Sequence, residues 1–343
     1  MILRQHPSTP GGAGSAAGSA AGSAAQARTY AGAMQALLNA IHAMDLPTDA
    51  RRVFHGRGGL HPGCEQWALD YFAPVWVLTS FQPASDAELA AVGAALATRW
   101  QQVADGQALN WVFQCRQQGK HQGRSSTRLM AGSVPQPHGV SEDGARFLVH
   151  VLAGQNHGLF LDMAEGRRWL RQQVAARPRA RVLNLFAYSC AFSVVALQAG
   201  ARQVINLDMS RGALAIGQRN HRLNGLTAGA SFLPHDLFNT WGKLTRGGPY
   251  ELVIIDPPSC QPGSFVATKD YPRLMRRLPE LLAPDGQLLL CLNAPELGPA
   301  FLQDAMREHA PGLAFVQRLA NPAGFADVSA ERSLKVLVYQ APA

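Results

Sequence analysis

A short apolar run that stops abruptly at a proline-rich turn limits this chain to a small set of folds. Residues 252–255 read Leu-Val-Ile-Ile and are followed by Asp256, Pro257, Pro258 and Ser259. A continuous aliphatic run is typical of a buried parallel strand, and two prolines cannot extend such a strand. Open α/β sheets bind ligands at the carboxyl ends of their strands, so this junction predicts an acidic side chain at a binding edge. A strand that merely ends in a rigid turn would read the same way, and the choice depends on the neighbouring segments.

Strand and helix patterns alternate from Arg146 onward, which is typical of a doubly wound sheet. Strands are predicted at residues 181–186, 203–207, 231–233, 251–255 and 287–292. Helices are predicted after the first strand as far as Ala199, at 210–224 and at 271–282. Phe315 and residues 334–339 are expected to close the sheet as an antiparallel C-terminal hairpin. The predicted fold class is therefore α/β, with a mostly parallel doubly wound sheet and a smaller α+β domain before it.

The chain divides into three predicted segments. Residues 1–28 form a tail rich in Gly, Ser and Ala, which offers nothing to bury, and we expect it to be disordered. Residues 29–145 form an N-terminal α+β domain, a candidate for substrate or RNA binding, and residues 146–343 form the domain with the motifs. In the N-terminal domain, helices are predicted at 34–44 and 86–102, and strands at 75–78 and 111–113. Its basic loops at 51–59 and 120–128 either contact RNA or are ordinary surface loops.

The composition fits a globular cytoplasmic protein. Of 343 residues, 47% are hydrophobic and 16% are charged, and no apolar stretch approaches the roughly 20 residues of a membrane helix. The first ten residues lack the apolar core of a secretory signal. Five cysteines are scattered without a Cys-x-x-Cys pair, which argues against a disulfide framework or a zinc site. We therefore expect no metal, no membrane partner and a cytoplasmic location.

The net charge at pH 7 is +8, and the surplus lies in the C-terminal part. Up to residue 145 there are ten Lys and Arg against nine Asp and Glu, and from residue 146 there are 21 against 14. The later basic residues form two groups, Arg167, Arg168, Arg171, Arg177, Arg179 and Arg181, and Lys269, Arg273, Arg276 and Arg277. A phosphate backbone is a natural partner for this charge, and solvated basic helices account for it equally well.

Two further acidic residues follow predicted strands, so three carboxylates are expected at one edge of the sheet. Asp208 follows the second strand, where a carboxylate can accept both hydroxyls of a ribose, and Asp236 follows the third, beside an expected adenine position. Each could instead cap a helix, and capping is a serious alternative for Asp208. Three carboxylates in register are hard to explain by capping alone.

The segment after the first strand, residues 184–193, contains no glycine. A dinucleotide enzyme would carry Gly-x-Gly-x-x-Gly there, so that the backbone can approach a pyrophosphate. A donor without phosphates, such as S-adenosylmethionine, removes this requirement. The segment therefore disfavours a dehydrogenase and favours an adenosyl-methionine site.

With these residues, the chain from about 142 to 296 resembles the catalytic domain of the bacterial large-subunit rRNA methyltransferases, a family of cytosine-C5 and guanine-N7 enzymes. The matching blocks are 158–162 with Arg167-Arg168, 184–189, 204–210, 220–226 and 256–259. The resemblance implies a class I methyltransferase fold, S-adenosylmethionine as cofactor and rRNA as partner. The cofactor contacts that it implies are Phe160, Asp162, Asn184, Phe186, Tyr188, Ser189, Asp208, Met209 and Asp236. The N-terminal half matches far more loosely, with no clear counterpart of the accessory RNA-binding module of some members.

The acceptor atom decides which further side chains are needed. Cytosine C5 is a poor nucleophile, so its methylation needs prior attack by a cysteine thiolate, whereas guanine N7 mainly needs alignment with the methyl group. An exocyclic amine lies between the two and is helped by hydrogen-bond acceptors around an Asp-Pro-Pro turn. Cys260 and Cys291 are the two candidates for such a thiolate. The cytosine-C5 relatives carry Cys-Ser-Cys-Ser near the end of the later strand, and the guanine-N7 relatives carry Ser-Asn-Asn. Residues 291–294 read Cys-Leu-Asn-Ala, so Asn293 matches the second pattern better.

We therefore expect direct methyl transfer to an RNA base in a pocket shaped by residues 256–259, with Asn293 at the base edge. Lys269, Arg273 and Arg277 are expected to contact phosphates, unless they form a solvated helix face. Covalent catalysis through either cysteine stays open, as does methylation of a protein amide or a small molecule. A non-catalytic RNA-binding protein is disfavoured by the intact acids at 162, 208, 236 and 256.

Overall fold

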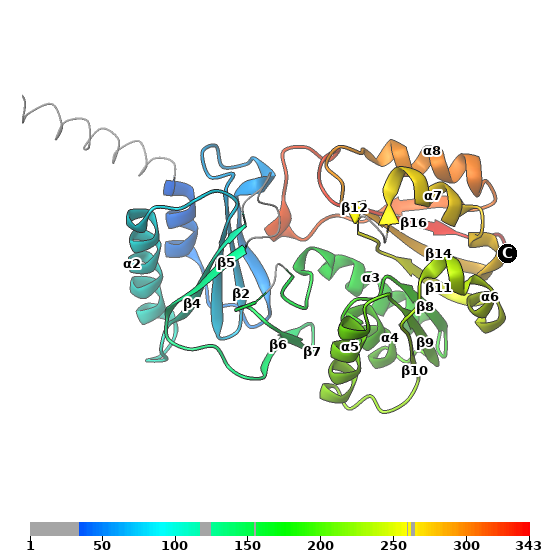
Figure 1. Ribbon diagram of the computed structural model, residues 1–343, viewed down its shortest axis with the longest axis horizontal. Coiled ribbons are helices and arrows are strands. Elements are labelled where there is room, and N and C mark those ends of the chain that lie inside the picture. The colour runs from blue at the N-terminus through cyan, green and yellow to red at the C-terminus, as the bar shows by residue number, and fades with distance from the viewer. Residues whose placement is uncertain (1–33, 117–124, 154–155, 259, 262–264) are drawn as a thin grey trace, which may run out of the picture.

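The computed structural model describes residues 34–116, 125–153, 156–258, 260–261 and 265–343 (Figure 1). The predicted tail, residues 120–124 of the second basic loop and Ser259 lie outside these residues. The strands are β1 (Arg51–His55), β2 (Trp67–Phe72), β3 (Val75–Ser80), β4 (Asn110–Arg116), β5 (Ser125–Ala131), β6 (His138–Glu142), β7 (Ala145–Val149), β8 (Arg181–Leu185), β9 (Gln203–Leu207), β10 (Ala230–Leu233), β11 (Tyr250–Ile255), β12 (Cys260–Gln261), β13 (Phe265–Val266), β14 (Leu282–Leu292), β15 (Ala314–Arg318) and β16 (Lys335–Gln340). After a helix at 34–43, the helices are α2 (Asp86–Val103), α3 (Ala164–Ala176), α4 (Ala191–Gln198), α5 (Arg211–Leu223), α6 (Leu237–Gly247), α7 (Ala267–Met275) and α8 (Pro299–His309), with short 3-10 turns η1 (Gly56–Gly58), η2 (Leu161–Met163), η3 (Leu278–Glu280) and η4 (Ala323–Phe325). In this described part of the chain, none of the helices combines the length and the apolar character needed to cross a membrane.

The N-terminal half is built on a five-stranded sheet in the order β1-β2-β3-β4-β5 (Figure 1). The helix at 34–43 and α2 pack on one face, around the buried rings of Trp67, Trp76 and Trp111. α2 begins at a capping box, in which the Ser85 hydroxyl accepts from the Glu88 N–H and the Glu88 carboxylate accepts from the Ser85 N–H. The helices and strands predicted for this half are present, with ends that differ by a few residues.

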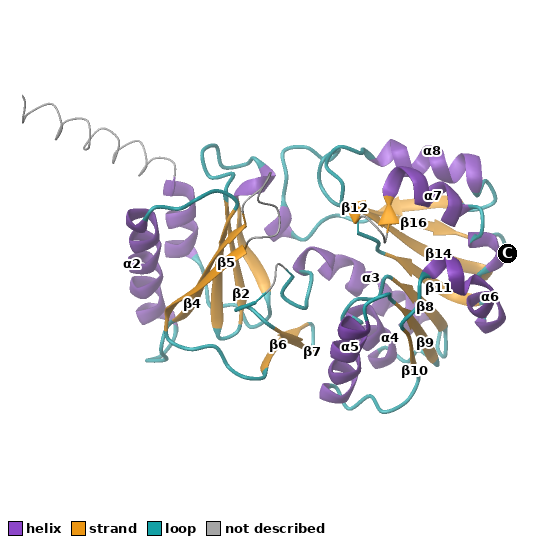
Figure 2. Cartoon of the chain, viewed as in Figure 1, coloured by secondary structure: helices purple, strands orange, loops and turns teal. Residues whose placement is uncertain are grey.

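The C-terminal half contains a seven-stranded sheet in the order β10-β9-β8-β11-β14-β16-β15. The strands from β10 to β14 are parallel, and β16 pairs antiparallel with both β14 and β15. α3 and α4 pack on one face of this sheet, and α6, α7 and α8 pack on the other (Figures 1 and 2). Because both faces are covered, the parallel strands carry continuous apolar runs. The predicted α/β class, with its antiparallel C-terminal hairpin, is confirmed.

Several predicted boundaries differ from the structure. The helix expected at 271–282 is α7, which ends at Met275, because the apolar residues Leu278 and Leu282 belong to η3 and to the start of β14. The helices α3, α6 and α8 and the β6–β7 hairpin have no counterpart in the sequence prediction. The predicted domain boundary between Ala145 and Arg146 falls inside β7.

Two connections join the N-terminal and C-terminal halves of the chain. Phe147 of the β6–β7 hairpin packs in one buried cluster with Val77 of β3 and Val195 of α4. The segment between β15 and β16 returns to the N-terminal half, where the Val328 N–H donates to the Gly58 carbonyl at 2.8 Å (Figure 1). The two halves are therefore joined by an apolar cluster and by a backbone hydrogen bond.

Candidate active site

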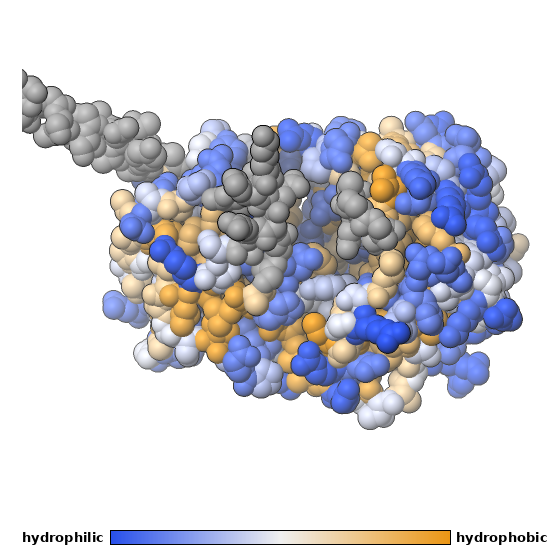
Figure 3. Space-filling model, viewed as in Figure 1, coloured by the Kyte–Doolittle hydropathy of each residue, from blue (hydrophilic) through white to orange (hydrophobic). Residues whose placement is uncertain are grey.

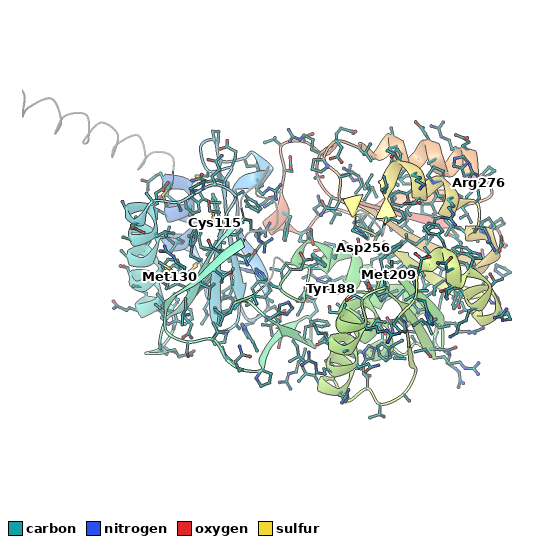
Figure 4. All side chains as sticks on the ribbon, viewed as in Figure 1. Cys115, Met130, Tyr188, Met209, Asp256 and Arg276 are labelled. Carbon is teal, nitrogen blue, oxygen red and sulfur yellow. The ribbon has the colours of Figure 1, made fainter. Side chains whose placement is uncertain are left out.

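A cavity of about 580 Å³ lies at the carboxyl ends of β8, β9, β11 and β14, next to the segment that follows β7. Small-molecule sites typically measure about 300–1,000 Å³. Figure 4 shows Tyr188, Met209 and Asp256 close together near the middle of the molecule. The lining residues are Asn156, Phe160, Asp162, Met163, Arg167, Phe186, Ala187, Tyr188, Ser189, Ala191, Phe192, Asp208, Met209, Ser210, Ala213, Asp256, Pro257, Pro258, Asn293 and Leu334.

Most of the site residues predicted from the sequence meet at this one cavity. Those that line it are Phe160, Asp162, Phe186, Tyr188, Ser189, Asp208, Met209, Asp256, Pro257, Pro258 and Asn293. Those that are absent from the described lining are Asn184, Asp236, Lys269, Arg273 and Arg277.

Asp208 is held at the cavity by two backbone groups. One carboxylate oxygen accepts from the Tyr188 N–H and the other from the Ser210 N–H, both at 2.8 Å. The cap of α5 is Ser210, whose hydroxyl accepts from the Ala213 N–H at 3.1 Å. The capping alternative for Asp208 is therefore wrong. Each carboxylate oxygen keeps a further lone pair, so the group can still accept hydrogen bonds from a ligand.

The loop between β8 and α4 turns tightly without glycine. Phe186, Tyr188 and Cys190 have φ angles of 57°, 46° and 60°, in the left-handed region. Such a conformation costs about 1–3 kcal/mol for a residue with a side chain. The loop is braced by the Ser189 hydroxyl, which donates to the Gly158 carbonyl at 2.6 Å. Aromatic side chains thus occupy positions where glycines would leave open space. The ring centroids of Tyr188 and Phe160 lie 5.2 Å apart.

Asp256 is a half-buried acid at the end of β11. Burial raises its pKa to about 7, the charge of Asp162 acts in the same direction, and Arg167 opposes both. Burial also raises the pKa of Asp162, against the charges of Arg52 and Arg167. A carboxyl group with a pKa near neutrality can exchange a proton with a reacting group at physiological pH.

Arg167 has a structural role instead of the phosphate contact considered for its basic group. It is buried, and its guanidinium donates to the Glu142 carboxylate at 2.5 and 2.7 Å and to the Phe160 carbonyl at 2.8 Å. This bidentate pair joins α3 to β6 and fixes the segment that carries Phe160 and Asp162. The sequence alone could not predict this ion pair, because Glu142 belongs to the β6–β7 hairpin, which was not predicted.

Asn184 and Asp236, both expected to contact the cofactor, have other partners. The buried Asn184 amide donates to the Asn206 side-chain oxygen at 2.9 Å, and Asn206 donates to the Ser193 hydroxyl at 3.0 Å. Asp236 caps α6 by accepting from the Asn239 N–H at 3.0 Å. For Asp236, the capping alternative thus describes the contact that is present.

The residues expected to contact phosphates do not line the first cavity. They belong to the region of α6, α7 and α8, where the surface is largely hydrophilic (Figure 3). Lys269 and Arg273 line a second cavity of about 320 Å³, together with Asp236. Arg277 is paired with the Glu280 carboxylate at 2.8 Å on the protein surface. Arg277 therefore forms a solvent-exposed ion pair just beyond the end of α7.

Cys291 is fully buried inside β14 and does not line the cavity. Burial raises the pKa of its thiol well above the usual value, and the charges of Asp256 and Asp162 act in the same direction. Cys260 belongs to β12, and its side chain lies outside the described part. Across the described ranges, no group of three or more His, Cys, Asp and Glu side chains is arranged to hold a metal ion.

Sequence reasoning missed several contributions to the cavity, and two of them come from polar side chains outside the main sheet. Asn156 lines it from the segment after β7, and Arg52 acts on Asp162 from β1 of the N-terminal half. Neither residue follows a predicted strand of the main sheet, so the strand-end rule could not find them. Arg52 did belong to the basic loop at 51–59, which was the available signal.

Known proteins resemble this chain over most of its length. A model of the S-adenosylmethionine-dependent methyltransferase family matches residues 51–340. Ribosomal RNA large subunit methyltransferase I of Aeromonas salmonicida is 31% identical over 172 residues, which is 48% of this chain and 43% of that protein. Ribosomal RNA large subunit methyltransferase K/L of a Psychrobacter species is 34% identical over 192 residues, which is 54% of this chain and 23% of that protein. The matched segments thus cover less than half of these relatives.

Solved structures share the fold. A chain crystallised in complex with SAH superposes with a TM-score of 0.72 at 22% identity, over 86% of this chain and 76% of its own length. A SAM-dependent methyltransferase from Agrobacterium tumefaciens superposes with a TM-score of 0.62 at 21% identity, over 87% of this chain and 92% of its own length.

Proposed function

The chain belongs to the S-adenosylmethionine-dependent methyltransferase family, and from this membership we propose that it methylates a base of RNA, most specifically of large-subunit rRNA, in the cytoplasm. Methyl transfer takes place directly in the cavity at the end of β11. The observation that carries the proposal is the meeting of Asp208, Tyr188 and Asp256 around one cavity at the carboxyl edge of a parallel sheet.

The lining fits an adenosyl-methionine. The cofactor supplies an electrophilic methyl group when it is bound. Asp208 would accept the ribose hydroxyls through the lone pairs left by its two backbone contacts. Phe160, Phe186 and Tyr188 provide apolar walls, in place of the glycine-rich cradle that a pyrophosphate requires. The exposed Met209 adds a further apolar contact at the rim.

Asp256 is the residue proposed to act on the acceptor. For an exocyclic amine as acceptor, a pKa of about 7 lets the carboxylate accept the amine proton as the nitrogen attacks the methyl carbon. Guanine N7 carries no proton, and for that atom the site would supply alignment alone. Pro257 and Pro258 would keep the turn rigid and the carboxylate aligned with the donor position. Asn293, which lines the cavity after β14, would hydrogen-bond the edge of the base.

Covalent catalysis is the second candidate for the chemistry. A cysteine nucleophile must reach the substrate as a thiolate, and Cys291 is buried in the core with a raised pKa. This burial favours direct transfer over a route through Cys291. The Cys260→Ala variant tests whether the other candidate cysteine acts as the nucleophile.

RNA is proposed as the substrate because the curated relatives are named as rRNA methyltransferases. A protein amide or a small molecule is the competing acceptor. Incubation of the protein with methyl-labelled S-adenosylmethionine and a lysate from cells that lack the gene separates these classes. We expect label in large rRNA, lost with Asp256→Asn and retained with Cys291→Ala and Cys260→Ala. Label confined to protein or to small metabolites would reject the RNA proposal, and loss of label with Cys260→Ala would reject direct transfer.

A further inference from the structure

Three arginines of the N-terminal half come together near the active-site cavity. They are Arg52 of β1, Arg57 of η1 and Arg116 at the end of β4, and we refer to them as the arginine cluster. The charges of Arg52 and Arg57 both act on Arg116. Arg52 is anchored by Asp70, its cross-strand neighbour in β2, through hydrogen bonds of 2.7 and 2.9 Å.

The cluster carries more positive than negative charge. Asp70 forms an ion pair with Arg52, whereas neither Arg57 nor Arg116 is paired with a carboxylate among the described residues. Arg116 donates to the Gln114 side-chain oxygen at 2.6 Å and lies 3.4 Å from the His157 ring nitrogen. Burial lowers the pKa of His157 to about 4, with Arg116 acting in the same direction, so this ring is neutral at pH 7.

The guanidiniums of the cluster repel one another. Burial lowers the pKa of Arg116 to about 10, the charge of Asp70 opposes this shift, and the charges of Arg52 and Arg57 add to it. Arg57 is more exposed, and partial burial together with the charge of Arg52 lowers its pKa. Two of the three guanidiniums lie over aromatic rings, with the Cζ atom 4.3 Å from the Phe325 ring centroid for Arg52 and 4.2 Å from the Phe81 ring centroid for Arg57. The guanidiniums are therefore preorganised, and a bound anion would relieve their repulsion.

Two observations place the cluster near the cavity, although none of its arginines lines it. The charge of Arg52 acts on Asp162, which lines the cavity. His157, the ring beside Arg116, directly follows Asn156, which also lines the cavity. An anion at the cluster would therefore sit beside a molecule in the active site, on the side of the N-terminal half.

We propose that the arginine cluster binds a phosphodiester group of the nucleic-acid strand whose base enters the active-site cavity. This inference rests on the proposed function and adds the surface that grips the strand. A base turned out of its stack leaves its own backbone at the mouth of the pocket, and arginine forks match phosphate oxygens in pairs. The N-terminal half then acts as the phosphate clamp for a reaction catalysed by the C-terminal half.

The test uses Arg116→Gln and Arg57→Gln in the full chain, with a fluorescent mixed-sequence single-stranded RNA as the binding probe. We expect each change to weaken RNA binding about tenfold, because a charge-assisted hydrogen bond is lost, and to reduce the slope of log K against log salt by about 0.7. The KM for RNA should rise with little change in kcat. Arg116→Lys should restore part of the affinity, since it keeps the charge without the fork.

Arg307→Gln is the control. It removes the same charge from the exposed surface of α8, outside the arginine cluster and the cavity lining. Calorimetric affinity for S-adenosylmethionine should be unchanged in every variant, which shows that the fold is intact. If the wild-type protein methylates RNA but Arg116→Gln and Arg307→Gln behave alike, the clamp is overturned while the proposed function stands. Competition by inorganic phosphate as strong as that by RNA would also overturn it, and failure of the wild-type protein to bind or methylate RNA would remove both proposals.

Discussion

Asp208 and Asp256 follow β9 and β11 at the same edge of the sheet, and their surroundings differ. The Asp208 carboxylate accepts two backbone N–H groups and stays at the wall of the cavity. Asp256 is instead a half-buried acid whose pKa is raised to about 7 by burial and by the charge of Asp162. The same functional group is therefore a fixed hydrogen-bond acceptor in one place, and in the other it has the pKa that the proposed role as a proton acceptor requires.

The pH dependence of catalysis tests the role of Asp256. A raised pKa keeps the carboxyl protonated at low pH, so kcat/KM should increase as pH rises through about 7 and then level off. Asp256→Asn should lower kcat/KM by about 10²- to 10⁴-fold and remove this rise. The folded state loses stability as pH rises through this pKa, because the ionised form is the one penalised by burial. The Asn variant should therefore be at least as stable as the wild-type protein at pH 8, and a pH profile that keeps its rise in this variant would assign the titration to another group.

Asn184 gives a test that separates structure from binding. Its amide satisfies the Asn206 oxygen inside the sheet, so Asn184→Ala leaves a buried acceptor and should lower the free energy of unfolding by about 1–3 kcal/mol. Urea titration measures this loss. The affinity for S-adenosylmethionine should change little; a large drop in affinity with unchanged stability would show that the side chain contacts the cofactor.

At the scale of elements, the loop between β8 and α4 depends on its contact with α5. Gly217 of α5 faces Cys190, and a Cβ added there would lie 2.4 Å from the Cys190 sulfur and 2.9 Å from its Cβ. Cys190 is fully buried and left-handed, so it has little room to move. The helix therefore holds the loop that lines the cavity.

Substitution of two glycines on the same helix tests this support. Gly217→Ala should destabilise the protein by about 1–3 kcal/mol through overpacking and weaken S-adenosylmethionine binding by shifting the loop. Gly212→Ala, where the nearest atom lies 3.9 Å from the added Cβ, should be neutral or stabilising by up to about 1 kcal/mol. Thermal unfolding and calorimetry report both effects. Equal behaviour of the two variants would mean that the loop does not depend on this contact.

Sequence patterns identified the strands of the main sheet because buried parallel strands are continuously apolar. Their ends then placed Asp208 and Asp256 at one edge. The same patterns could not show that the Asn184 side chain binds Asn206 in the next strand. Whether this side chain contacts Asn206 or a ligand depends on how the two strands pack. The left-handed loop was equally hidden, since Phe186 and Tyr188 are residues that rarely adopt positive φ.

At the scale of the whole molecule, the active site depends on contacts between distant parts of the chain. Arg52 acts on Asp162 across more than a hundred residues of sequence, and the β6–β7 hairpin joins the two sheets through one buried cluster. No local pattern predicts such contacts. They bring the arginine cluster of the N-terminal half near the cavity, which suits the proposed modification of a nucleic-acid strand.

The most direct test of this account is nucleoside mass spectrometry of large-subunit rRNA from cells with and without the gene. We expect one methylated base to disappear without the gene, to return with the wild-type protein and to stay absent with Asp256→Asn. Identical rRNA methylation in all of these cells would contradict the account.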